Sequence, residues 1–136
     1  MKLKYCLLVL VISSFLASLI QTNFGKVDVT LERLDTNNSQ YIYYDLYKPK
    51  SATPENKAPF IAIIPGFQRS KEALSNIAIE LSRRGYVVGL IDPYAQGLSS
   101  SSLSRRAATT EGYGMFALID HIHESDHYNY IDKTLL

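Results

Sequence analysis

Residues 58–99 place two uninterrupted apolar runs around an amphipathic segment, and this pattern constrains the fold more than any other feature of the chain. The first run, residues 60–64, has no polar alternation, as expected for a strand that is covered on both faces. Pro65 and Gly66 end this run, because proline cannot donate to a sheet ladder and glycine readily adopts positive φ. The second run covers residues 86–91. A strand, a helix and a strand in this order predict a right-handed crossover between two parallel strands.

The segment between the two runs has the residue spacing of an amphipathic helix. Ser70 suits its N-cap, and Glu72 lies in its first turn, where the positive end of the helix dipole favours a carboxylate. Gly85 follows the last turn as a stop signal. We expect the apolar stripe to be buried and the polar residues to lie mostly on the other side. The stripe is Ala73, Leu74, Ile77, Ala78 and Leu81, and the polar residues are Lys71, Asn76, Glu80 and Arg83.

The segments before this unit predict a hairpin and a connector. Apolar and polar residues alternate over residues 27–32 and 42–47, with turn-forming residues at 35–39 between them. This pattern predicts two antiparallel strands joined by a turn. The stretch 49–59 carries three prolines among polar residues, which is typical of an exposed connector.

A loop and a second helix follow the unit. Residues 94–106 are rich in serine, which is typical of a loop. Apolar residues recur at helical spacing over residues 115–122, and Thr109 or Thr110 is the expected N-cap of this second helix.

The N-terminal segment predicts how the chain meets a membrane. Residues 5–20 are almost uninterruptedly apolar and follow Lys2 and Lys4, as in a signal peptide or a single membrane anchor. No clear Ala-x-Ala cleavage site follows, which favours an uncleaved anchor formed by residues 1–22. The lysines precede the apolar run, so we expect the N-terminus inside and the following domain outside the membrane. A secreted, cleaved protein is the alternative.

The boundaries and composition of the chain fit this division. We expect a signal-anchor or signal peptide at residues 1–24 and a domain at residues 25–136. The formal net charge is +1 and no basic patch stands out, so nucleic acid is not an expected partner. Cys6 is the only cysteine and lies in the apolar segment, so neither a disulfide framework nor thiol chemistry is expected.

Three short motifs in the central unit resemble those of α/β-hydrolases. They are Pro65-Gly66-Phe67, Ser70-Lys71-Glu72 and the turn after the second strand, residues 91–99. The similarity covers residues 27–136 and is strongest to the dienelactone-hydrolase-like and serine-aminopeptidase-like branches. Residues 18–27 also resemble membrane-anchored bacterial members.

The resemblance implies an α/β fold, namely the N-terminal part of an α/β-hydrolase. An antiparallel hairpin would lead into parallel strands with crossover helices, preceded by one hydrophobic helix. The sequence departs from the usual motifs at two places. Pro65 replaces a histidine, and Ala95-Gln96 replaces Gly-His. None of these positions holds a member of the catalytic triad.

The resemblance also implies a site residue. In such enzymes one oxyanion-hole amide comes from the turn after the third strand, here Gly66-Phe67, with the Phe67 N–H as donor. The alternative is that Pro65-Gly66 simply ends the strand. Asp92 invites a catalytic interpretation, but in this family an acid at its position more often fixes the loop.

The nucleophile of the family is missing from the sequence. A serine elbow needs the pattern Gly-x-Ser-x-Gly, and no glycine pair of the chain supplies it. The acid and the histidine follow the serine along the chain in this fold, so no catalytic residue is expected here. Residues 130–136 resemble the approach to the fifth strand. We therefore expect a truncated serine hydrolase of ester or amide bonds that is inactive alone. A non-catalytic membrane-tethered module or a decayed relic is the alternative.

Three histidines raise a minor alternative. His121, His123 and His127 resemble the zinc motif of metallo-β-lactamase-like hydrolases, with one residue too many before the acid. The plainer interpretation is a polar helix end, where histidine interacts well with the negative end of the dipole. No metal and no cofactor is expected. A dinucleotide fingerprint is absent as well, because Gly66 opens no Gly-x-Gly-x-x-Gly pattern.

Overall fold

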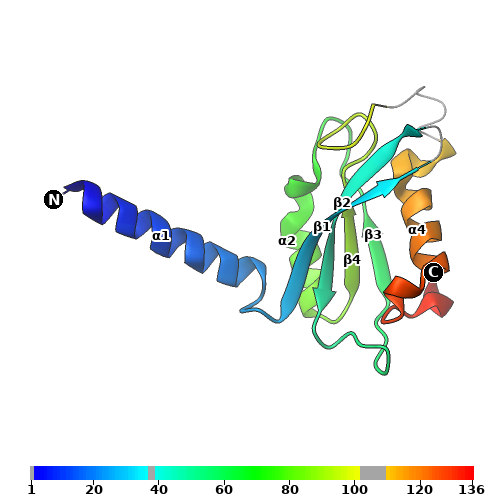
Figure 1. Ribbon diagram of the computed structural model, residues 1–136, viewed down its shortest axis with the longest axis horizontal. Helices are drawn as coiled ribbons and strands as arrows, with labels where there is room; N and C mark the ends of the chain where they lie inside the picture. Colours follow the sequence, from blue (N-terminus) through cyan, green and yellow to red (C-terminus); the bar gives the residue numbers. More distant parts are fainter. Residues whose placement is uncertain (1, 37–38, 102–109) are drawn as a thin grey trace.

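The chain forms a four-stranded sheet between two helices, with a long N-terminal helix projecting from the domain (Figure 1). The computed structural model describes residues 2–36, 39–101 and 110–136. Its main elements are α1 (Lys2–Gln21), β1 (Val27–Asp35), β2 (Tyr41–Pro49), β3 (Phe60–Ile63), α2 (Ser75–Arg83), β4 (Val87–Ile91) and α4 (Met115–Glu124). Short 3-10 turns with bounds in the described residues are η2 (Lys71–Leu74), η3 (Gly112–Gly114), η4 (Asp126–Tyr128) and η5 (Lys133–Leu135).

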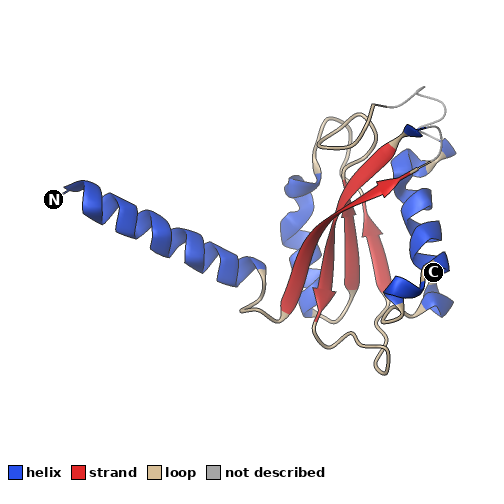
Figure 2. Ribbon diagram, viewed as in Figure 1, coloured by secondary structure: helices blue, strands red, loops and turns tan. Residues whose placement is uncertain are grey.

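The strand order is β1-β2-β4-β3, and it confirms both the hairpin and the crossover unit. β1 pairs antiparallel with β2, placing Leu31 opposite Asp45. β3 and β4 are parallel, with Phe60 opposite Val87, as the two apolar runs predict. α2 covers one face of the sheet and α4 covers the other (Figure 2).

β4 divides the core into two apolar layers. Val87 and Ile91 pack into the layer that contains Leu118 and Ile122 of α4. Val88 and Leu90 belong to the layer that contains Ala78 of α2. All five residues of β4 are buried, which explains why its sequence shows no polar alternation.

Two expectations for the first helix are wrong. Lys71 is only 5% exposed, because its ammonium group lies 3.0 Å from the carboxylate of Asp45 on β2. Ile77 is 46% exposed and Ala73 is exposed as well, although both belong to the expected apolar stripe. The cause is that the segment begins as η2, whose tighter winding shifts the buried stripe of the following α2 to Ala78 and Ser82.

The start of the second helix also differs from the expectation. α4 begins at Met115, and its N-cap is Gly114 in a left-handed conformation, with φ of 97°. Thr110 is therefore not its cap, because η3 and the positive φ of Tyr113 interrupt the helix. Thr109 and residues 102–106 of the expected loop lie outside the described residues.

The last residues begin to extend the sheet beyond β3. Ile131 forms a parallel bridge with Ala58. The backbone N–H of Ala58 donates to the carbonyl oxygen of Tyr130, and the backbone N–H of Asp132 donates to the carbonyl oxygen of Ala58, both at 2.9 Å. This places residues 130–132 beside the start of β3, where the approach to a fifth strand is expected. The chain then turns into η5.

Gly89 in β4 gives a test of this core. A Cβ at this position would lie 2.8 Å from the ring of Phe60 and 3.0 Å from Leu118. We expect Gly89→Ala to lower the free energy of unfolding by about 1–3 kcal/mol, since overpacking displaces both side chains. Gly66→Ala is the matched control, because a Cβ there meets nothing within 4 Å. Urea unfolding of both variants that gives equal stabilities would contradict the described packing.

Candidate functional site

The candidate oxyanion turn, residues 66–69, follows β3 directly. The N–H of Arg69 donates to the carbonyl of Gly66 at 3.2 Å, and Gln68 has φ of 60°, as in a type II turn. Phe67 is 83% exposed. Within the described residues, the structure pairs its backbone N–H with no acceptor. This N–H is therefore available to a ligand at the end of the strand.

Asp92 connects η2, which follows the candidate turn, to the loop after β4. Its carboxylate is fully buried and accepts from the N–H of Lys71 at 2.7 Å and from the N–H of Leu98 at 3.0 Å. Gly97 is required beside it, because a Cβ there would lie about 2 Å from the carboxylate. Asp92 thus fixes two loops, the role that the resemblance assigns to an acid at this position.

The residues that depart from the family motif also shape the turn. Gln96 accepts a hydrogen bond from the N–H of Arg69 at 2.7 Å, so it supports the candidate turn from the neighbouring loop. Ala95 has φ of 63°, in the left-handed region. This conformation costs a non-glycine residue roughly 1–2 kcal/mol, which explains why glycine is usual at this position of the motif.

A cluster of charged side chains around the buried Lys71 lies beside the turn. The ammonium group of Lys71 contacts Asp45 at 3.0 Å and Glu72 at 2.9 Å. Burial opposes the charge of Lys71, but its bonds to Glu72 and Asp45 outweigh this effect and raise its pKa. Hydrogen bonds from Ser70 and Lys71 lower the pKa of Glu72 to about 2. No sequence signal points to this cluster, since Asp45 occupies an ordinary polar position in a distant strand.

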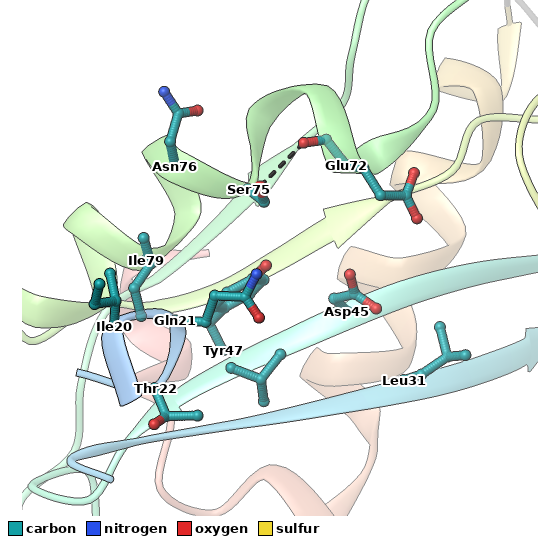
Figure 3. Close-up of a pocket in the computed structure, with 11 residues that line it drawn as sticks. Ile20, Gln21, Thr22, Leu31, Asp45, Tyr47, Glu72, Ser75, Asn76 and Ile79 are labelled. Carbon is teal, nitrogen blue, oxygen red and sulfur yellow. Dashed lines mark hydrogen bonds between the residues drawn. The ribbon is translucent and has the colours of Figure 1, made fainter. Parts of the chain in front are cut away.

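A groove of about 630 Å³ lies between α2 and the hairpin (Figure 3). Its apolar walls include Ile20 from the end of α1, Leu31 from β1 and Ile79 from α2. Asp45 and Glu72 lie at the end away from Ile20. The groove exists because α2 leaves part of β1 uncovered. Neither Gly66 nor Phe67 lines it, so it is separate from the candidate turn.

The three histidines do not form a metal-binding group in the described part of the chain. His121 lies on α4 and His127 on η4, and each packs edge-on against Tyr128, with ring centroids 5.6 and 5.1 Å away. His123 lies on α4 as well. The rings of His121 and His127 thus contribute to packing at the end of α4.

Replacing Asp92 tests its role in fixing the loops. Asp92→Asn leaves one oxygen for two N–H donors and turns its amide group toward the other donor. We expect a loss of about 1–3 kcal/mol in the free energy of unfolding, because a buried donor loses its acceptor. Asp120→Asn on the exposed side of α4 is the control and should change stability by less than about 0.5 kcal/mol. An Asp92→Asn variant as stable as the wild type in thermal unfolding would refute this role.

Comparisons with known proteins find similarity at the level of the fold. No protein family and no curated protein matches the sequence. A hypothetical protein from Pseudomonas aeruginosa superposes with a TM-score of 0.61 at 23% identity, over 75% of this chain and 32% of its own. The α/β-hydrolase GrgF from Penicillium sp. sh18 gives 0.59 at 18% identity, over 72% and 33%. The epoxide hydrolase VrEH1 from Vigna radiata gives 0.52 at 18% identity, over 72% and 29%.

These similarities agree with the arrangement of strands and helices. The chain spans about a third of the length of each of these three proteins. The chain has the N-terminal part of the α/β-hydrolase fold.

Proposed function

We propose that this chain carries the N-terminal part of a membrane-anchored serine hydrolase of ester or amide bonds. In this proposal the backbone N–H of Phe67 is one donor of the oxyanion hole, which binds the carbonyl oxygen that gains charge during acyl transfer. The observation that carries the proposal is the turn at residues 66–69. It leaves the Phe67 N–H without an acceptor in the described residues, while Arg69 and Lys71 next to it are held by Gln96 and Asp92.

The rigidity of the turn supports this role. An oxyanion donor is effective when it is fixed before the reaction, because no reorganisation is then needed in the transition state. The N–H groups of Arg69 and Lys71 donate to Gln96 and Asp92 of the loop after β4, and these two bonds fix the segment that follows Phe67. Gly66 carries no side chain that would cover the amide.

The anchor is the second part of the proposal. The helical segment Leu3–Gln21 has a mean hydropathy of 2.2, and none of it is buried against the domain. A helix of this length can cross the apolar core of a bilayer. Lys4 near its start favours an N-terminus inside and a domain outside the membrane. A secreted protein whose signal peptide is removed is the alternative.

We further propose that these 136 residues have no hydrolytic activity by themselves. Their sequence contains no Gly-x-Ser-x-Gly elbow, and an amide donor without a nucleophile cannot form an acyl-enzyme. A non-catalytic membrane-tethered module remains the second candidate function, and the same missing elbow favours it.

Labelling with a fluorophosphonate probe tests the proposed inactivity. The purified chain of 136 residues should remain unlabelled in detergent, while an active serine hydrolase added to the same sample is labelled. Intact-mass analysis would locate any adduct. A stoichiometric adduct on a serine of this chain would refute the proposal.

The coding DNA and one substitution test the proposed role of Phe67. We expect a Gly-x-Ser-x-Gly elbow within about ten codons after Leu136 in one of three frames. In the protein extended through that frame, Phe67→Pro removes the N–H, and proline suits the second position of a type II turn. We expect kcat for an ester to fall about 10²–10³-fold.

Phe67→Ala is the matched control, because it removes the ring and keeps the N–H. Its kcat should remain far above that of Phe67→Pro. Equal kcat values for the two variants would refute the oxyanion role. Stop codons and unrelated sequence in all three frames would instead favour the non-catalytic module.

A further inference from the structure

Four basic side chains gather where the domain meets the end of α1. Lys26 precedes β1, Lys50 follows β2, and Arg83 and Arg84 close α2. They line one cavity of about 370 Å³, and we call them the basic cluster. The sequence shows no basic patch because these residues come from three separate segments. The fold brings them together.

A hydrogen bond connects the basic cluster to the end of α1. The guanidinium group of Arg83 donates to the carbonyl oxygen of Ile20 at 2.9 Å. The N–H of Lys50 donates to the carbonyl oxygen of Lys26, also at 2.9 Å. Figure 1 shows α1 leaving the domain beside the start of β1 and on the side of α2. If α1 crosses a bilayer, the basic cluster lies where that bilayer meets water.

The charges of the basic cluster are only partly balanced. Glu80 lies 2.9 Å from Arg84 and 3.8 Å from Arg83, and Asp28 lies 3.9 Å from Lys50. The side chains of all three pairs are between 33% and 68% exposed, and ion pairs at such exposed positions are weak. The four cations therefore exceed the two nearby carboxylates by two charges. An anionic group can displace the exposed carboxylates at little cost.

We infer that the basic cluster binds the anionic phospholipid headgroups of the leaflet in which α1 ends. This inference rests on the proposed membrane anchor. A guanidinium group matches a phosphate with two parallel hydrogen bonds, and Arg83 and Arg84 supply two such groups. The contact holds the domain against the bilayer with its α2 side toward the lipid. Each basic side chain near an anionic surface adds about fivefold in affinity.

Native mass spectrometry of the full chain tests this inference. The protein is released from nanodiscs that contain equal parts of phosphatidylglycerol and phosphatidylcholine. We expect the wild type to retain phosphatidylglycerol preferentially. The double variant Lys26→Gln/Arg84→Gln should lose about tenfold or more of this preference, because two of the four charges are removed. Arg83 is left unchanged because it also contacts Ile20.

A matched control variant and a competing anion test whether the lipid contact is specific to the basic cluster. Lys57→Gln/Arg69→Gln removes one lysine and one arginine from exposed positions outside the basic cluster and should keep the wild-type preference. No headgroup preference in the wild type, or an equal loss in both variants, would overturn the inference. Displacement of the lipid by excess inorganic phosphate would show a free-anion site and would also overturn it.

The same spectra distinguish failure of the anchor from failure of the inference. An intact mass that lacks α1 would show a cleaved signal peptide, which refutes both the anchor and the lipid contact. An intact mass that includes α1, without headgroup preference, refutes the lipid contact alone. The oxyanion proposal is tested separately by Phe67→Pro.

Discussion

The complete burial of β4 is the constraint on which the rest of this structure depends. The strand pairs antiparallel with β2 on one side and parallel with β3 on the other, and both of its faces are covered. A polar side chain in β4 without a hydrogen-bond partner would destabilise the fold. Gly89 lacks a side chain, so the side chains of Phe60 and Leu118 can pack against the backbone of the strand. The two loops at its carboxyl end are then positioned by Asp92, the residue that follows it. The candidate turn and η2 after it are thus held by the loop that follows β4, through Gln96 and Asp92.

Much of this fold could be predicted from the sequence, because the informative signals were local. The apolar runs at residues 60–64 and 86–91 have the composition of buried parallel strands, and the structure confirms their pairing. The burial of Lys71 could not be predicted, because its partner Asp45 is in a distant strand. The exposure of Ile77 depends on a 3-10 turn that shifts the helix by part of a turn, and amphipathic spacing alone does not reveal such a shift.

The candidate site shows the same division between local and distant signals. The turn at Gly66 and Phe67 could be identified from the dipeptide that ends the strand and from the family motif. The hydrogen bond from Arg69 to Gln96 could not be predicted, because the two residues are far apart in the sequence and only the fold brings them together. Gln68 and Ala95 both adopt left-handed conformations there. Backbone strain of this kind is concentrated where loops are fixed by many interactions, as they are around Asp92.

The bridge between Ala58 and Ile131 has a consequence for assembly. Among the described residues, no strand pairs with the side of β3 that faces away from β4. The bridge sets the parallel direction and the register of residues 130–132 beside the start of β3. Such an open edge is a template, and it accepts a strand from its own chain or from another molecule. In the described sheet β1 and β3 are both edge strands, and the bridge to Ile131 begins to cover the edge of β3 while the outer edge of β1 has no partner strand.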